Sequence, residues 1–257
     1  MKQIKPLILL CILSAFWSCS DNSDVVMHPI GVTFNFSHSW NGTDVTRLDF
    51  NEFEFVTENE DTLSITRLRY LLSEFTFTHE SGVVTTIEGY NLVDLTNEEN
   101  LSFTTTESIL PGNYTVSFRF GFSDDLNIDG AYADLNTASF EVPSIFGGRY
   151  HYMQFEGKYL DANSDEMSFV YHTIRAFDPT GANDPQDTSF QVNLGSVEVL
   201  DGNTNINVQA DLYQWFSTPN LWDLNELNTS LMGNYDAQIQ MSQNGTNVFS
   251  LVDVTQE

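Results

Sequence analysis

The sequence is poor in two kinds of residue that many functional sites require, cysteines and basic side chains. Only two cysteines occur in 257 residues, and nine lysines and arginines stand against 36 aspartates and glutamates, for a net charge of −27. Nucleic acid and anionic lipid headgroups are recognised by clustered lysine and arginine. We therefore expect no nucleic-acid partner. We interpret most of the acidity as surface solubility, with attraction of cations as its functional remainder.

The N-terminal residues have the order of a secretory signal. Lys2 and Lys5 precede an apolar stretch, residues 7–17, which is shorter than the roughly 20 residues of a membrane span. The stretch leads into a small residue and Cys19, which resembles the lipobox of bacterial lipoproteins. We expect residues 1–18 to be a lipoprotein signal peptide and Cys19 to carry the lipid that anchors the protein to the membrane. The alternative is an ordinary signal peptide that contains a cysteine.

Export determines the location and the chemistry of the mature chain. The polar, acidic residues after Cys19 resemble the surface-export tether of lipoproteins in the Bacteroidetes group. We expect residues 19–30 to be a flexible tether from the outer membrane, with the protein facing the periplasm or the cell surface. Cys11 is lost with the signal, so no disulfide, thiolate metal site or cysteine nucleophile remains. Loss of Lys2 and Lys5 leaves 7 basic against 36 acidic side chains, a net charge of −29.

Alternating apolar and polar residues indicate a single, mostly β domain over residues 31–257. The first run, from Val32 to Trp40, has an apolar or aromatic side chain at every second position, as a half-buried strand does. Turn signals such as Asn41-Gly42 separate the runs. The same pattern recurs in residues 53–55, 69–79, 114–122, 150–159, 167–174 and 190–200. We predict an antiparallel β-sandwich or open barrel.

One segment near the C-terminus departs from the alternation. Leu231, Tyr235 and Ile239 stand at helical spacing, and Asn244-Gly245 can end a helix. We predict one short C-terminal helix near residues 229–243 that packs on the sheets.

Catalytic signatures are missing from the sequence after the signal. It contains no nucleophile elbow, phosphate-binding glycine loop, dinucleotide fingerprint or HExxH zinc helix. Paired carboxylates for glycoside hydrolysis stay open only because 36 acidic residues always include some pair that can meet in space. We therefore expect a binding protein rather than an enzyme, and a hydrolase is the least supported function.

Three of the five histidines are candidates for a metal site. His38, His151 and His172 are each in phase with apolar residues of their strands, so we expect them to face the core, where an imidazole needs a partner. If they converge, their nitrogens suit copper or zinc, and Met153 is an additional ligand suited to copper(I). Binding should then weaken as pH falls through the histidine range, near 6.5. The alternative is that each ring is a core histidine satisfied by the backbone or a carboxylate.

An acidic loop offers a second, harder cation site. Asp125, Asn127, Asp129 and Gly130 reproduce the first half of a DxNxDG calcium loop, in which alternate oxygens turn inward and glycine permits the bend. The twelfth position is Asn136 instead of the bidentate glutamate. A solvated acidic loop is therefore the favoured interpretation, and a calcium site is the alternative.

Several segments, taken in order, resemble landmarks of the MbnP-like proteins. The most distinctive is residues 147–159 (GGRYHYMQFEGKY), followed by Tyr171-His172-Thr173. The other segments are residues 34–42, 65–73, 90–94, 111–122, 215–220 and 243–250. They cover nearly the whole chain after the signal, so the resemblance is specific in combination.

The resemblance implies a secreted β-rich protein that binds copper. His38, His151 and His172 match the histidine positions of the family, some of whose members are encoded with methanobactin systems. It also implies a di-haem peroxidase-like or metal-transport partner. In copper-binding relatives the di-haem partner oxidises a tryptophan to kynurenine before the Gly-Tyr-His-type strand, but residues 140–148 contain no tryptophan here. Kynurenine formation is therefore not implied.

A second function of a different class stays open, a non-catalytic surface or adhesion module for a glycan or a partner protein, with calcium as a stabilising ion. Its aromatic platform would be Trp215 and Trp222, if these side chains are exposed. Core packing is the favoured interpretation of both tryptophans because large aromatic side chains are usually mostly buried.

Overall fold

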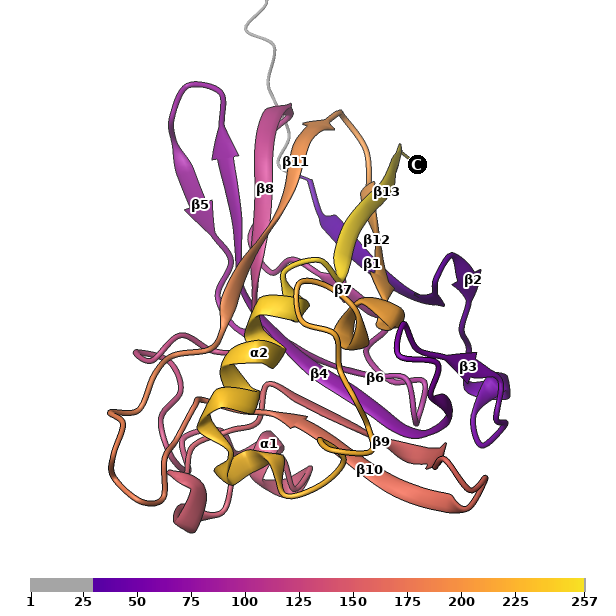
Figure 1. The fold of residues 1–257 in the computed structure, drawn as a ribbon. Coiled ribbons are helices and arrows are strands. Elements are labelled where there is room, and N and C mark those ends of the chain that lie inside the picture. Colours follow the sequence, from indigo (N-terminus) through magenta and orange to yellow (C-terminus); the bar gives the residue numbers. More distant parts are fainter. Residues whose placement is uncertain (1–29, 257) are drawn as a thin grey trace, which may run out of the picture.

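The computed structural model describes residues 30–256, which form a mostly β fold of two sheets (Figure 1). The larger sheet pairs strands in the order β10 (Glu166–Thr173), β9 (Met153–Leu160), β4 (Thr62–His79), β8 (Gly112–Phe120) and β11 (Phe190–Val199). Three shorter strands also pair with β4, namely β3 (Phe55–Val56), β5 (Val84–Thr86) and β6 (Tyr90–Asp94). The fold class that the alternation predicts is confirmed.

Strand β4 gives the larger sheet its curvature. It is 18 residues long, and its register shifts against β9 between Ile65 and Arg67 and against β8 between Ser73 and Thr76. Such bulges bend a strand and increase its twist. The sheet therefore curls into a half-barrel, with the two ends of β4 at opposite ends of the molecule (Figure 1).

The smaller sheet contains the one parallel pair among the named strands of the described chain. Its order is β13 (Phe249–Gln256), β12 (Thr204–Asp211), β1 (Val32–Trp40) and β2 (Thr43–Asp44), with β7 (Ser102–Thr104) also paired to β1. β1 runs parallel to β12 over eight residue pairs, from Val32 opposite Thr204 to Ser39 opposite Asp211. Parallel neighbours need a long connection, and here most of the larger sheet lies between them in sequence.

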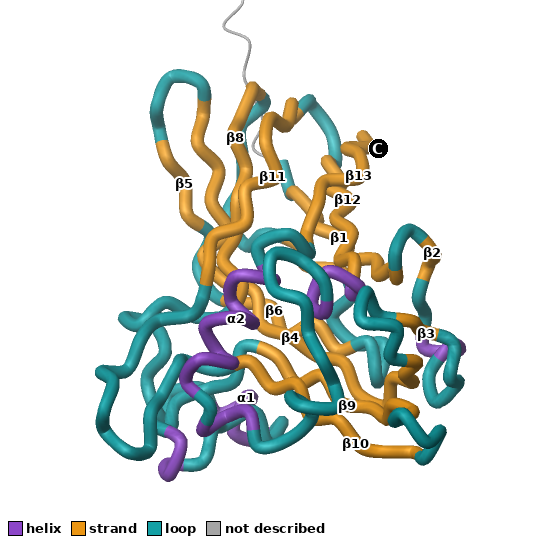
Figure 2. Tube along the Cα trace, in the orientation of Figure 1, coloured by secondary structure: helices purple, strands orange, loops and turns teal. Residues whose placement is uncertain are grey.

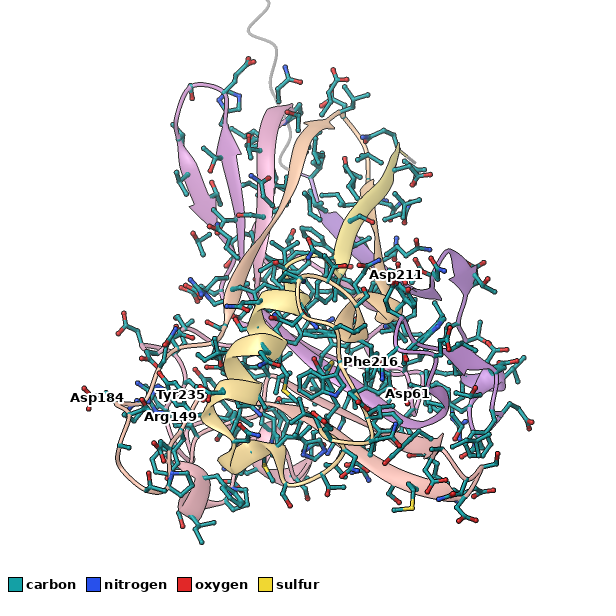
Figure 3. All side chains as sticks on the ribbon, in the orientation of Figure 1. Asp61, Arg149, Asp184, Asp211, Phe216 and Tyr235 are labelled. Carbon is teal, nitrogen blue, oxygen red and sulfur yellow. The ribbon has the colours of Figure 1, made fainter. Side chains whose placement is uncertain are left out.

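The core between the sheets is built largely from aromatic rings. Trp215 and Trp222 are 1% and 0% exposed, and Tyr171 packs on Trp222 with ring centroids 4.7 Å apart. Phe216, in the interior of Figure 3, packs 5.2 Å from Tyr171. Core packing of the two tryptophans is therefore confirmed, and they form no exposed platform for a glycan.

Within residues 30–256, helical structure is limited to two α-helices and a few 3₁₀ turns (Figure 2). The C-terminal helix α2 (Tyr235–Gly245) is the longer; α1 (Ala133–Thr137) has five residues. α2 begins later than predicted because Leu231–Gly233 forms a separate 3₁₀ turn and the Asn234 side chain caps the helix by accepting from the Ala237 N–H. No helix among the described residues is long and apolar enough to cross a membrane.

Candidate metal centre

His151 and His172 lie side by side, with ring centroids 5.0 Å apart and ring planes at 89°. His172 is on β10, and His151 stands two residues before β9, where its backbone N–H donates to the Phe140 carbonyl at 3.0 Å. Both residues are buried, at 3% and 8% exposure. Two candidate ligands thus share one buried position.

This position is on the face of the larger sheet that is turned away from the main core. Across the strands, His172 stands opposite Gln154, and Gln154 stands opposite Arg69. Their neighbours along the strands, Tyr171 and Tyr70, belong to the core between the sheets. Because successive side chains of a strand point to opposite faces, the histidine pair lies behind the core.

The segment after α1 covers the pair. The Ser139 carbonyl accepts from the Gln154 side chain at 3.3 Å and from Arg69 at 3.4 Å. The Phe140 ring lies 5.6 Å from the His151 ring and under the Arg69 guanidinium. This cover excludes water from rings that would otherwise be exposed on an outer sheet face.

The hydrogen bonds of the two rings fix which nitrogen carries the proton. His151 Nδ1 lies 3.0 Å from the Phe140 carbonyl oxygen, which can only accept, so Nδ1–H donates. His172 Nε2 lies 2.9 Å from Glu156 Oε1, and this carboxylate is held ionised because the His172 contact, followed by Arg67, lowers the pKa of Glu156. His172 Nε2–H therefore donates. The lone pairs remain on His151 Nε2 and His172 Nδ1.

Those two nitrogens are buried and have no hydrogen-bond partner within residues 30–256. A buried polar atom without a partner costs about 1–3 kcal/mol, so two in neighbouring rings point to an absent partner. A metal–imidazole bond is about 2.0 Å long, so one ion reaches both nitrogens if they lie within roughly 4 Å of each other. A ring separation of 5.0 Å permits this.

In metal-binding histidines, the ring nitrogen that does not bind the metal donates its N–H to a carboxylate or a backbone carbonyl. His151 Nδ1 and His172 Nε2 are held in the same way. Here the acceptors are Glu156 and the Phe140 carbonyl. The candidate ligands at this position are the two histidine nitrogens, and no group of three or more His, Cys, Asp or Glu side chains in the described chain is arranged to hold an ion.

Burial keeps His151 neutral and able to coordinate. Desolvation, followed by the nearness of His172, lowers the pKa of His151 to about 3. Protons therefore compete with a metal for His151 only at a pH far below 6.5, the value near which the sequence predicts that binding weakens.

His38 does not join the pair. It lies on β1 in the main core, 3% exposed, with Nε2 2.9 Å from the Tyr70 hydroxyl. Tyr70 follows Arg69 on β4 and points to the opposite face, so the sheet separates His38 from the other two histidines. Burial lowers the pKa of His38 to about 4. Its partner is a tyrosine hydroxyl, and not the backbone group or carboxylate that the alternative to a metal site named.

Met153 also lies on the core side. It is fully buried in the core cluster that contains Tyr70, which it faces across the β9–β4 pair. The sequence placed His151 in phase with Met153, but β9 begins only at Met153, so the alternation does not extend back to His151. His172 likewise shares a face with Gln154, while Phe169 and Tyr171 point to the main core.

In the acidic loop, two of the side chains that the alternative calcium site would use as ligands bond to the backbone instead. Asn127 is 1% exposed and its Oδ1 accepts the Tyr150 N–H at 2.9 Å. Asp129 Oδ1 accepts the Arg149 N–H at 2.9 Å. Asp125 lines a separate hollow with Glu74 and Glu88. The inward oxygens thus bind the backbone that precedes β9, which positions His151.

Sequence reasoning missed the residues that surround the pair: Glu156, Gln154, Arg69, Arg67 and Phe140. Glu156 and Gln154 alternate with core residues of β9, so the sequence pattern indicates that their side chains face away from the main core. No sequence pattern indicates the position of Phe140, because its contact with His151 depends on the path of a loop.

Fold and site together define a class of protein, a two-sheet β protein with a covered histidine pair behind its core. A family model described as MbnP matches residues 29–234, which is most of the chain. The chain therefore belongs to the MbnP family.

Comparison with solved structures and curated proteins adds one relative. The solved structure of MbnP from Methylosinus trichosporium is similar to 76% of this chain and 80% of its own, with 13% identity and a TM-score of 0.47. No curated protein matches the chain.

Proposed function

We propose that this protein is a non-catalytic binding protein that holds one copper ion between His151 and His172, for sequestration or transfer. The observation that carries the proposal is the pair of buried, unpartnered nitrogens, His151 Nε2 and His172 Nδ1. Membership of the MbnP family supports copper as the metal.

The donor set favours copper over the other candidate ions. Structural zinc sites use four ligands, and calcium takes six to eight oxygens. Two neutral imidazoles suit copper(I), which accepts two ligands.

Copper titration of the chain from residue 20 onward tests the proposal. Both sheets lie within residues 30–256, so this chain retains the fold. We expect one copper(I) per chain in the presence of a reductant, and a loss of at least 100-fold in affinity for His151→Ala and for His172→Ala. His79→Ala is the control, since His79 is the last residue of β4 and bonds to Ser81 in the β4–β5 hairpin.

Equal stoichiometry and affinity in all four proteins would rule out the histidine pair. Thermal unfolding of the apo proteins shows whether the variants remain folded. The variants, and not a pH series, separate histidine binding from carboxylate binding.

The site of action in our proposal is the outer membrane, reached through lipid on Cys19, which lies outside the described residues. We infer a periplasmic or cell-surface location and, from the family, a di-haem peroxidase-like or metal-transport partner. Labelling with a palmitate analogue should mark the wild type and leave Cys19→Ala unlabelled, because that thiol is the one acylation site of the lipobox. Equal labelling of both would contradict the anchor.

A further inference from the structure

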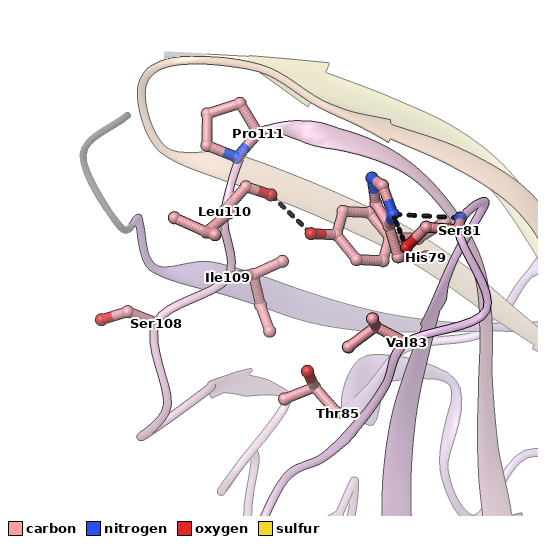
Figure 4. A pocket seen from close by; sticks show the side chains of 9 residues that line it. His79, Ser81, Val83, Thr85, Ser108, Ile109, Leu110 and Pro111 are labelled. Atoms are coloured by element: carbon pink, nitrogen blue, oxygen red, sulfur yellow. Dashed lines mark hydrogen bonds between the residues drawn. The ribbon is translucent and has the colours of Figure 1, made fainter. Parts of the chain in front are cut away.

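A pocket lies at the other end of β4 from the histidine pair, between the β4–β5 hairpin and the segment that leads into β8 (Figure 4). Its volume is about 410 Å³, within the range of roughly 300–1,000 Å³ of small-molecule sites. Arg69 and His79 are ten residues apart on β4, so the pocket is about 30 Å from the metal centre along the strand. It is therefore a separate site.

The walls of the pocket are apolar, and Val83, Ile109, Leu110 and Pro111 contribute most of them. None of its lining residues is an aspartate, glutamate, lysine or arginine. A ligand in this pocket meets no fixed charge, and the strongly acidic chain disfavours an anion nearby.

Most polar atoms in the lining already have partners. His79 Nδ1 accepts from the Ser81 N–H at 3.1 Å and lies 2.7 Å from Ser81 Oγ. The Tyr114 hydroxyl donates to the Leu110 carbonyl at 2.8 Å (Figure 4). The Thr85 and Ser108 hydroxyls complete the polar lining. The pocket thus fits a ligand whose inserted part makes few hydrogen bonds.

The pocket also lies where the described chain begins. The backbone of Ile30 exchanges two hydrogen bonds of 3.0 Å with Ile109, in the pocket wall. Cys19 is 11 residues before Ile30, and a fully extended chain of that length spans at most about 40 Å. Val83 and Leu110 at the rim are 63% and 48% exposed. A lipid on Cys19 would therefore keep this apolar rim close to the bilayer.

We propose that this pocket binds one acyl chain of an uncharged or zwitterionic bilayer lipid. The chain enters between Val83 and Leu110, with its polar end at the rim. The nearness of the bilayer depends on the proposed lipid anchor, whereas the affinity for an acyl chain does not.

Calorimetric titration of the chain from residue 20 onward with 1-decanoylglycerol, below its micellar concentration, tests the proposal. We expect one molecule per chain, and at least tenfold weaker binding by Val83→Glu and by Leu110→Glu. Ile128→Glu should bind like the wild type, because Ile128 is 56% exposed but does not line the pocket. Decanoate should bind at least tenfold more weakly than the ester.

Absence of saturable binding, or equal weakening by Val83→Glu and Ile128→Glu, would overturn the proposal. So would dimers in sedimentation that Val83→Glu dissociates without any affinity for decanoylglycerol, because the pocket would then face a second copy. Copper titration of the same variants separates the two sites: their copper affinity should equal that of the wild type.

Discussion

At the residue scale, the three candidate histidines differ in what their hydrogen bonds leave free. His38 Nε2 is bonded to the Tyr70 hydroxyl within the core. His151 and His172 each use one nitrogen for a bond and keep the other buried and unpartnered. The metal ion that we propose would give both nitrogens a partner at once, and no side chain within the described residues does so.

Glu156 should affect copper affinity without touching the metal. Its carboxylate accepts from His172 Nε2–H, which fixes the tautomer and raises the basicity of Nδ1. Glu156→Gln keeps an acceptor but removes the charge, and we expect copper affinity to fall about 10- to 100-fold. Glu166→Gln on the neighbouring strand is the matched control, because Glu166 pairs only with the exposed Lys158. Equal affinities of the two variants would contradict this role.

His38 should make folding stability depend on pH. Its pKa is about 4 in the folded protein and 6.5 without burial, so between these values the unfolded chain takes up a proton that the folded chain does not. Stability is therefore greatest above pH 6.5 and falls as pH decreases towards 4. Between pH 7.5 and 5.0 the wild type should lose about 2 kcal/mol more than His38→Gln.

Chemical denaturation at the two pH values measures this difference. His151 titrates in both proteins and cancels in the comparison. An identical loss in wild type and His38→Gln would show that His38 is not the group responsible.

At the element scale, helix α2 continues the hydrogen bonding of β10 beyond its last strand pair. The Gln238 side chain donates to the His172 carbonyl at 2.9 Å and to the Leu231 carbonyl at 3.1 Å. Its Oε1 accepts from the Ile174 N–H at 2.8 Å. One buried amide thus binds the backbone on both sides of Thr173 and holds the end of the strand that carries His172.

Gln238→Leu should be strongly destabilising, because it leaves three buried backbone groups without partners. At about 1–3 kcal/mol for each group, we expect a loss of at least about 3 kcal/mol in the free energy of unfolding. Gln240→Leu on the same helix should cost far less, since the Gln240 side chain has no such contacts with β10. Denaturant titration of both variants measures the difference, and similar losses would contradict the role of Gln238.

Alternation in the sequence located the strands well because it is a local property of each strand. Residues 32–40 and 167–174 match β1 and β10 within a residue. The strands β12 and β13 were missed, although Ile206, Val208 and Ala210 alternate with polar residues. Alternation also failed to identify the face on which the histidines lie, because both faces of β10 are covered and His151 precedes its strand.

At the scale of the whole molecule, the partners of each site come from distant parts of the chain. The parallel pairing of β1 with β12 joins residues more than 170 positions apart, and no local pattern specifies it. The cover that Phe140 forms over His151 depends on the path of a loop. The sequence therefore predicts the class of fold, and its three candidate histidines include both members of the pair. It does not predict which of the three histidines meet.

The molecule also separates its two sites. The histidine pair lies near β9 and β10. The apolar pocket lies beside the β4–β5 hairpin, close to the start of the described chain (Figure 1). The proposed lipid anchor on Cys19 would place the pocket nearer to the membrane than the histidine pair. The net charge of −27 raises the local concentration of cations around the whole protein, and the histidine pair would supply the selectivity in the proposed function.

Anomalous diffraction from copper-loaded crystals, recorded on both sides of the copper absorption edge, tests the central claim most directly. We predict one strong peak per chain, within about 2.0 Å of both His151 Nε2 and His172 Nδ1, and no peak at His38. A peak at the acidic loop or beside His38, with the nitrogens of His151 and His172 still unpartnered, would contradict the account.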